Sequence, residues 1–387
     1  MERKFVYLDN NATTRVDDRV VEEMQKYFTE IYGNPSSLYD LGQQAREAIE
    51  SARKRVAKIL NCPEQDVFFT GSGTESDNIA IKGVARRYQN KGKHIITSAI
   101  EHHAVLNSVE YLAKKEGFEY SLVNVGSDGI IDLDHLKSLI REDTILISVM
   151  YANNETGAIQ PIEEIGKIAK EKGIYFHTDA VQAAGKLPLD VKKLNVDMLS
   201  LSGHKFHAPK GVGILYKRTG INPIPLFHGG HHEKNLRPST ENVPYIMGIA
   251  KALEIAYEEF DEHKEKIYKL KMMLKEGIEK NIDGIVLNTP EKSVFNTLNY
   301  SFKGIEGESI LFSLNDFGIG VSTGSACTSG SLEPSHVIKA MGRDHATCHG
   351  SIRFSLSKYN TEEEIKYTVE KLKEVVERIR KISPYKQ

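Results

Sequence analysis

Short apolar runs alternate with amphipathic stretches between about residues 67 and 217 of the chain. The runs are rich in β-branched and aromatic side chains, which is typical of buried strands. The predicted strands are 67–70, 94–97, 144–149, 174–177, 198–201 and 213–216. Strands separated by helices in this way predict strand–helix–strand units and a mainly parallel sheet covered on both faces. The pattern therefore indicates an α/β fold.

One helix between two of these strands can be bounded from the sequence. Ile162, Ile165 and Ile168 fall on one face of a helix. Pro161 stands near its start, and Gly173 can adopt the left-handed conformation that ends a helix. The pattern predicts a helix between this proline and this glycine.

The pattern changes after Gly220. A stretch rich in Gly, Pro and His runs over 223–244, and we interpret the change as the crossing into a second domain. The elements predicted next are a charged helix over about 248–282, strands over 297–302 and 351–356, a loop of small residues over 322–331 and a closing helix. Thr361 and Glu364 form a capping box at the start of that helix. Its predicted buried stripe is Ile365, Val369, Leu372, Val376 and Ile379.

Composition excludes several classes of protein. The chain has 387 residues, 40% hydrophobic and 27% charged, which is enough to bury a large core. With 51 basic and 53 acidic side chains the net charge is -2, so binding to nucleic acid is not indicated. No apolar run is long enough to span a membrane and no signal peptide is present, so we expect a cytoplasmic protein. The three cysteines contain no C-x-x-C pair, which argues against a disulfide framework and a cysteine-rich zinc site.

A lysine just past a predicted strand gives the strongest local signal. Lys205 follows small and hydroxyl residues in the sequence SLSGHK. Ligands of open α/β sheets bind beyond the carboxyl ends of the strands, and a crowded lysine there more easily becomes the neutral amine that attacks a carbonyl. The alternative is an ordinary surface lysine in a loop.

Asp179 stands at the end of another apolar run, where a solvated charge is not normally placed. A buried carboxylate needs a cation, and the pyridinium nitrogen of pyridoxal phosphate is one. The alternative is a turn or helix-capping residue.

The loop that follows the strand at 67–70 has the character of an anion site. Gly73 and Thr74 lie where this loop enters a helix, so free N–H groups, the helix dipole and a hydroxyl all favour a phosphate. Ser76 stands where the dinucleotide fingerprint requires its last glycine, and many ordinary strand-to-helix turns have a similar composition.

Two further polar residues follow strand ends. His102 is placed to stack on a flat cofactor ring and move protons, or simply to cap the next helix. Asn154 is placed to hydrogen-bond cofactor or substrate, or to occupy a turn.

Eight motifs spread over nearly the whole chain resemble the NifS/IscS group of cysteine desulfurases. They are YLDNNATT (7–14), YGNPSS (32–37), GTES (73–76), EH (101–102), ANNE (152–155), HTDA (177–180), SGHK (202–205) and SACTS (325–329). The resemblance implies a homodimeric fold-type I pyridoxal-phosphate enzyme with a mainly parallel seven-stranded sheet. Its large domain would cover 14–259, and its smaller α+β domain 1–13 and 260–387, with a catalytic cysteine loop at about 320–334.

The resemblance also assigns roles to the cofactor site. It implies Lys205 as the lysine that attaches pyridoxal phosphate, Asp179 as the partner of its ring nitrogen, and His102 as the ring-stacking acid and base. Gln182 matches the partner of the phenolic oxygen. The implied phosphate ligands are Thr74, Ser202 and His204, and Gly73 and Asn154 are further cofactor-binding positions.

For the substrate, L-cysteine, the resemblance implies Arg353 and Asn154 as the groups that hold its carboxylate. Cys327 lies in a run of small residues poor in apolar anchors and matches the thiol that takes the sulfur as a persulfide, leaving alanine. The loop length is similar to that of the long-loop class. No metal site is expected, apart from a transient contact of Cys327 with an iron–sulfur cluster.

The resemblance further implies iron–sulfur cluster assembly through an acceptor of the IscU/NifU type, with tRNA thiolation and other thio-cofactors as further destinations. The family motif whose threonine reaches the neighbouring subunit's phosphate reads Arg237-Pro238-Ser239-Thr240 here, so Thr240 keeps its type while the backbone before it is more restricted. The chain ends at Gln387, and we expect it to fall short of the extension with which some homologues hold the scaffold protein.

The alternatives to a cysteine desulfurase are a selenocysteine lyase or aminotransferase that does not need Cys327, and a non-catalytic sulfur carrier.

Overall fold

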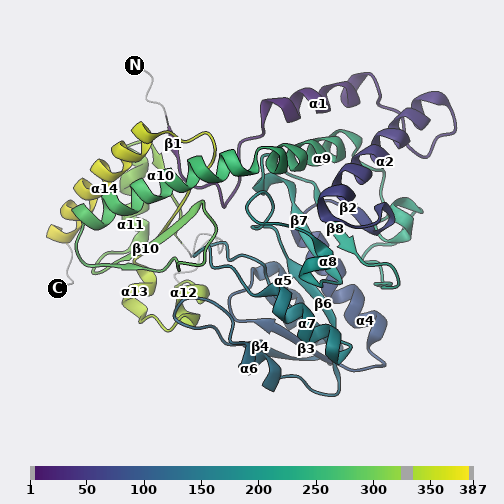
Figure 1. The fold of residues 1–387 in the computed structure, drawn as a ribbon, viewed down its shortest axis with the longest axis horizontal. Helices are drawn as coiled ribbons and strands as arrows, with labels where there is room; N and C mark the ends of the chain where they lie inside the picture. The colour runs from purple at the N-terminus through teal and green to yellow at the C-terminus, as the bar shows by residue number, and fades with distance from the viewer. Residues whose placement is uncertain (1–4, 324–333, 383–387) are drawn as a thin grey trace.

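A seven-stranded sheet forms the centre of the larger part of the molecule (Figure 1). The structure is a computed structural model that describes residues 5–323 and 334–382. In spatial order the strands are β2 (Val67–Thr70), β8 (Gly213–Lys217), β7 (Met198–Ser202), β6 (Tyr175–Asp179), β5 (Thr144–Ser148), β3 (His94–Ser98) and β4 (Glu119–Val123). β8 runs antiparallel to β2 and β7, and the other neighbouring strands of this sheet are parallel. The predicted mainly parallel α/β sheet is confirmed.

Neighbouring residues of each strand face two different layers of helices. Phe69 and Leu199 belong to a cluster with the first layer, whereas Phe68 and Met198 pack with the second, as the period of two along a strand requires. The first layer contains α1 (Asp18–Thr29), α2 (Asp40–Leu60), α6 (Leu133–Ser138), α7 (Ile162–Lys172), α8 (Val191–Leu194) and α9 (Val243–Glu258). The second contains a π-helical turn (Ile79–Gly83), α4 (Val84–Tyr88) and α5 (His103–Glu116), and α3 (Gly73–Asn78) leads directly into that turn. Strands buried on both faces read as continuous apolar runs, which is why the sequence revealed them.

The helix predicted between Pro161 and Gly173 is confirmed as α7. Pro161 stands at its N-cap, and Gly173 ends it with φ 68°, where its N–H donates to main-chain carbonyls of the last turn. The strand β4 is absent from the predicted set. It lies at the edge of the sheet and is largely exposed, so it lacks the apolar run that marks the buried strands.

A second group of elements lies at the other end of the molecule (Figure 1). It consists of β10 (Thr297–Phe302) between β12 (Ser351–Ser355) and β9 (Ile285–Leu287), the parallel pair β1 (Val6–Tyr7) and β11 (Ile319–Gly320), and the helices α10 (Phe260–Asn281), α11 (Gly307–Asp316), α12 (His336–Ala340), α13 (His345–His349) and α14 (Glu362–Ile382). The helix predicted over 248–282 is wrong as a single element, because the chain breaks at Glu259 between α9 and α10.

We propose that the chain divides at this break into the predicted domains, 14–259 and 1–13 with 260–387. Two buried apolar clusters support the division. One draws its residues from between Val20 and Ile255, and the other combines Val6 and Leu8 with residues from Ile267 onward. The parallel pairing of β1 with β11 ties the N-terminal strand to the smaller domain.

The capping box predicted for the closing helix is confirmed. The main-chain N–H of Thr361 donates to the Glu364 carboxylate over 3.2 Å, and the Glu364 N–H donates to the Thr361 hydroxyl over 3.3 Å. The predicted stripe faces the smaller domain's core, with Val369 and Ile379 only partly buried.

A buried ion pair anchors the loop between β8 and α9. Glu233, Lys234 and Asn235 all have positive φ, at 44°, 55° and 68°. The Glu233 carboxylate accepts two hydrogen bonds of 2.9 Å from the Arg53 guanidinium of α2 and one of 3.0 Å from the Phe69 N–H of β2. Both side chains are about 95% buried, so the pair holds this unusual turn against the sheet.

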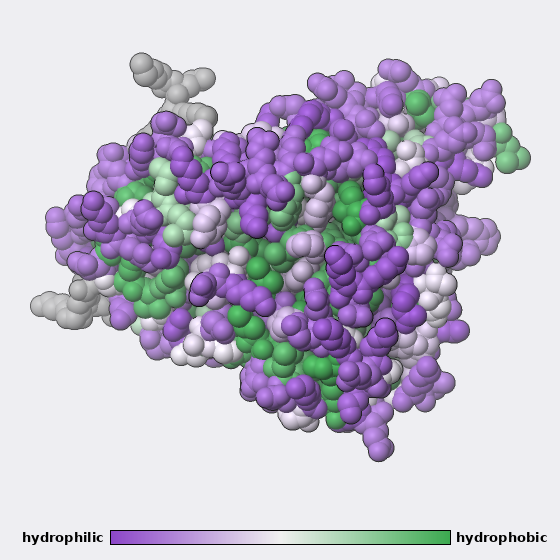
Figure 2. Space-filling model, in the orientation of Figure 1, coloured by the Kyte–Doolittle hydropathy of each residue, from purple (hydrophilic) through white to green (hydrophobic). Residues whose placement is uncertain are grey.

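Polar side chains cover most of the face seen in Figure 2, with smaller apolar areas between them. In the ranges 5–323 and 334–382, no helix is long and apolar enough to cross a membrane.

Candidate active site

The carboxyl ends of the parallel strands bring the predicted polar residues to one edge of the sheet. β6 ends at Asp179, β7 at Ser202 and β3 just before His102. Asp179 pairs in register with Ser200 of β7. Because parallel strands all point the same way, residues that follow different strands meet at this edge.

The first turn of α3 forms an anion cradle at the same edge. A Cβ at Gly73 would lie 2.8 Å from Val181 Cγ2 and 3.0 Å from Ser202 Cβ, so only glycine allows the helix to approach this closely. The Ser72 hydroxyl caps the N–H of Glu75, while the N–H groups of Gly73 and Thr74 have no acceptor among the described residues. A phosphate group would fit here, because it could accept from these two N–H groups and contact the exposed Thr74 side chain and Ser202.

Asp179 is the buried carboxyl group of the site. Its Oδ1 accepts a 2.9 Å hydrogen bond from the Val181 N–H. Burial raises the pKa of Asp179 to about 6, while that hydrogen bond and the nearby charge of Lys205 oppose the rise. A bound cation would favour the ionised form, so Asp179 fits the protonated ring nitrogen of pyridoxal phosphate.

A polar network behind Asp179 was not predicted from the sequence. His177 bridges the hydroxyls of Ser148 and Ser200, with its ring nitrogens 2.9 Å from each oxygen. Asp77 of α3 lies with Oδ1 3.6 Å from His177 Nε2. Burial, and then the charge of Asp179, raise the pKa of Asp77, whereas burial lowers the pKa of His177 to about 3. The network therefore favours neutral groups, which leaves Asp179 as the carboxylate available to a cation.

His102 caps α5, as one of its two interpretations predicted, and its role at a cofactor stays a prediction. Its Nδ1 accepts a 3.1 Å hydrogen bond from the Ala104 N–H, which places the ring proton on Nε2. Burial, and then the charge of Lys205, lower the pKa of His102 to about 4. The ring is therefore neutral at pH 7 and presents an N–H donor at Nε2.

Lys205 lies in a single turn, η3 (Gly203–Lys205), directly after β7. Its Nζ donates to the carbonyls of Asn11 and Ala12 over 2.7 and 2.8 Å. These bonds stabilise the ammonium form, so the lysine must leave them to act as a nucleophile. The neighbouring His204 has Nδ1 3.2 Å from the Thr13 hydroxyl, and burial lowers its pKa to about 4.

Asn11 links the other predicted residues to this lysine. Its carbonyl also accepts from Gln182 Nε2 over 3.0 Å, and its Nδ2 donates to the Asn154 carbonyl over 3.1 Å. Arg353 Nη1 donates to the same Asn154 carbonyl over 2.9 Å. The structure therefore brings Lys205, Gln182, Asn154 and Arg353 together around one residue.

Arg353 is a buried cation with spare donor capacity. Its Nη2 donates to Asp9 Oδ1 over 2.7 Å, while its Nε has no partner among the described residues. The guanidinium is 4% exposed and fits a carboxylate ligand. Asp9 lies in the YLDNNATT motif and had no predicted role, because no pattern in the sequence connects it with Arg353.

Thr240 stands apart from this cluster. Thr240 is exposed and lines a pocket with Gly71 and Arg237 that does not include Lys205. Arg237 pairs with Glu75 of α3 over 2.8 Å. Cys327 lies outside the described residues.

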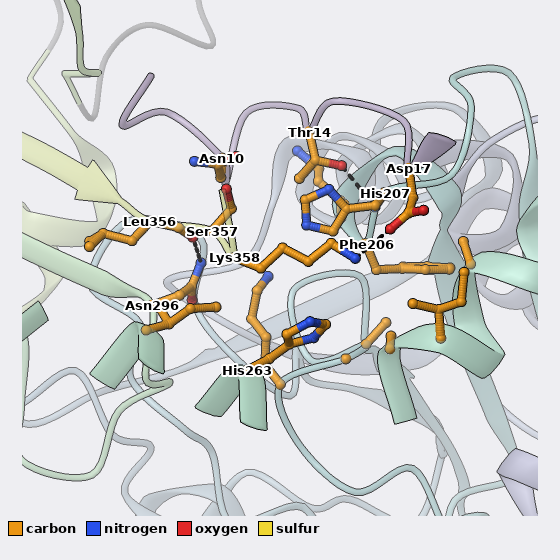
Figure 3. A pocket seen from close by; sticks show the side chains of 18 of the residues that line it. Asn10, Thr14, Asp17, Phe206, His207, His263, Asn296, Leu356, Ser357 and Lys358 are labelled. Carbon is orange, nitrogen blue, oxygen red and sulfur yellow. Dashed lines mark hydrogen bonds and ion pairs between the residues drawn. The ribbon is translucent and has the colours of Figure 1, made fainter. Parts of the chain in front are cut away.

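The cavity of Figure 3 borders the cluster. Lys205 lines it, but Gly73, His102, Asp179 and Ser202 do not. In Figure 3, Lys358 reaches Asp17 in an ion pair of 2.5 Å, and the hydroxyl of Thr14 accepts from the main-chain N–H of His207.

Glu101 offers a test of burial at this edge of the sheet. Its Oε1 accepts from Ser98 and from the Met150 N–H, and its Oε2 has no partner among the described residues. Burial raises the pKa of Glu101 from 4.5 to about 8, so between these values the folded state holds a proton that the unfolded state has lost. The wild type therefore loses stability as the pH rises through this window.

As the pH rises from about 6 to about 8, we expect the free energy of unfolding of Glu101→Gln to increase by about 2 kcal/mol relative to that of the wild type. The measurement is denaturant unfolding of both cofactor-free proteins across this range. A constant difference in stability between them would contradict a raised pKa.

Comparisons with known proteins agree with this geometry. Residues 6–368 match the family described as aminotransferase class-V. A cysteine desulfurase IscS of Methanosarcina thermophila is 52% identical over 383 residues, 99% of this chain and 95% of that protein. Another, of Dictyoglomus turgidum, is 50% identical over 386 residues, covering 100% and 98%. A solved structure titled NifS-like protein has a TM-score of 0.92 at 46% identity, covering 97% of this chain and 100% of that one.

The resemblance inferred from the motifs is thereby confirmed over the full length of the chain. The fold and the cofactor follow from this membership and agree with the buried Asp179 and the free donors at Gly73 and Thr74. The chain therefore belongs to the aminotransferase class-V family, as a pyridoxal-phosphate-dependent enzyme of the cysteine desulfurase group.

Proposed function

We propose that the chain converts L-cysteine to L-alanine and transfers the sulfur to Cys327 as a persulfide for iron–sulfur cluster assembly. The observation that carries this proposal is the link through Asn11. It joins Lys205, the nucleophile, to Asn154 and Arg353, the proposed site of the substrate carboxylate.

The chain's own residues have distinct tasks in this reaction. Arg353 and Asn154 hold the cysteine carboxylate, which orients the amino group and the sulfur. When bound, pyridoxal phosphate supplies an electron sink that weakens bonds at the carbons next to the amino group. His102, neutral at pH 7, donates from Nε2, and proton removal by the same ring requires its tautomer to change. Lys205 leaves the carbonyls of Asn11 and Ala12 to attach the cofactor.

The described cysteines support Cys327 as the sulfur acceptor. Burial raises the pKa of Cys62 to about 12, and burial also raises the pKa of Cys348. Thiols with raised pKa are poor nucleophiles because the thiolate is the reactive form. Neither cysteine is therefore suited to accept sulfur at neutral pH.

A homodimer is part of the proposal. Large apolar side chains are exposed on α1, on the segment between α1 and α2, and on the loop after β8. They are Phe28, Tyr32, Leu38, Tyr39 and Phe227. Such an area favours contact with a second copy, and Thr240 would reach the neighbouring phosphate site. The proposed sulfur acceptor is a scaffold protein of the IscU/NifU type in the cytoplasm.

The test is alanine formation from L-cysteine by protein loaded with pyridoxal phosphate, with a reductant present. We expect one sulfide for each alanine, because the reductant releases the persulfide sulfur. L-Aspartate serves as a control amino acid that has no sulfur to transfer. Loaded protein that forms no alanine would contradict the proposed function.

A further inference from the structure

Lys186 is a buried lysine that the reaction described above does not use. It follows Gly185, whose φ is 69° and where an added Cβ would lie 3.1 Å from Ala256 of α9. The turn therefore packs closely against that helix. The lysine is 9% exposed, and no carboxylate of the described residues pairs with it. Its charge is held instead by neutral oxygen atoms.

Both of these oxygen atoms belong to Gln182. Lys186 Nζ donates over 3.1 Å to the Gln182 carbonyl and over 3.1 Å to its side-chain Oε1. On the other side of the amide, Gln182 Nε2 donates over 3.0 Å to the Asn11 carbonyl. An ammonium can only donate and a carbonyl can only accept, so the two contacts select the same orientation of the amide.

The ammonium shares its surroundings with two other cations of the site. Lys186 and Lys205 line the same cavity. Burial, and then the charges of Lys205 and Arg353, lower the pKa of Lys186 to about 7. Burying this cation costs desolvation, and its hydrogen bonds to Gln182 are the interactions that offset part of that cost.

We propose that Lys186 is a positioning residue that fixes the amide of Gln182, so that the second N–H of its Nε2, the one not donated to Asn11, faces the phenolic oxygen of bound pyridoxal phosphate. The proposal rests on the function proposed above, which assigns this oxygen to Gln182. An N–H that donates to the phenolic oxygen makes this oxygen a weaker acceptor for the proton it would share with the Lys205 nitrogen. Loss of this donor should therefore raise the pKa of that proton. Lys186 would therefore act on the cofactor through Gln182, without touching it.

The test is a pH titration of the visible absorbance band of the loaded protein. We expect Lys186→Met to raise the midpoint by about 0.5 to 1 pH unit, the effect of one lost neutral hydrogen bond. Methionine keeps the length of the side chain and removes a buried charge, which proteins generally tolerate. Lys186→Gln, which retains a neutral donor, is expected to return the midpoint towards that of the wild type.

A double-mutant cycle separates positioning from a direct effect of the charge. In a Gln182→Leu background, Lys186→Met is expected to shift the midpoint no further. Lys271→Met is the matched control, because this lysine is also buried but donates to Ser293 and Val294 instead. It should leave the midpoint unchanged.

Two results would overturn the proposal. One is a wild-type midpoint in Lys186→Met, and the other is an equal shift in the presence and absence of Gln182. Failure of the proposed function would be seen in a different measurement. The wild type would then form no alanine from L-cysteine, whatever the titration midpoint of Lys186→Met.

Discussion

Replacing Cys327 by serine is expected to lower alanine formation from L-cysteine by about 10³-fold or more. The hydroxyl of serine is far less acidic than a thiol, so no comparable nucleophile is available at neutral pH to take the sulfur. The visible absorbance of the loaded protein should stay the same, because the residues that hold the cofactor remain. The measurement is alanine release together with the absorbance spectrum.

The two remaining cysteines provide matched controls for this experiment. Cys62→Ser and Cys348→Ser each remove a thiol whose pKa is raised by burial, and we expect wild-type rates from both. Equal alanine release from Cys327→Ser and the wild type would exclude Cys327 from the reaction. It would favour an enzyme that expels the sulfur directly, as a lyase does.

Asp179→Asn is expected to lower kcat/KM for alanine formation by about 10² to 10³-fold. Asparagine keeps the shape of the side chain but cannot carry the charge that keeps the cofactor's ring nitrogen protonated. Removing one member of a buried ion pair costs about 3–5 kcal/mol, and the lower part of this range, about 3–4 kcal/mol, corresponds to these factors in rate. The measurement is steady-state kinetics at saturating cofactor.

Asp77→Asn is the appropriate control for this variant. Asp77 lies behind Asp179 in the same buried network, and its raised pKa favours the neutral acid. A neutral amide in its place should change the rate by less than about tenfold. If the two variants lost activity equally, disturbance of the network would explain the loss, and a role for the charge of Asp179 would be contradicted.

The buried parts of the fold could be predicted from the sequence because burial leaves a pattern. The central strands read as apolar runs, and α7 carries its cap residues at both ends. The strand β4 could not be found in this way, since an exposed edge strand has no such run. The break at Glu259 was missed because helical patterns continue on both sides of it.

The residues of the candidate site that lie at the carboxyl ends of strands could be predicted from the sequence. Asp179 and Ser202 fall at strand ends, and parallel strands bring those ends together. Asp9 and Lys186 were not assigned roles, because their importance lies in contacts with Arg353 and Gln182. Of these two contacts, only Lys186 with Gln182 had a signal in the sequence, the spacing of four residues that places them on one face of a helical turn.

The Arg53–Glu233 pair has a mechanical consequence. Through Glu233 it fastens the loop that leads to Thr240 onto β2, and β2 runs directly into the turn that carries Gly73 and Thr74. The two segments proposed to meet phosphate groups are thus attached to the same strand, through a buried ion pair that dissolved salt screens only weakly. Any displacement of this strand moves the two segments together.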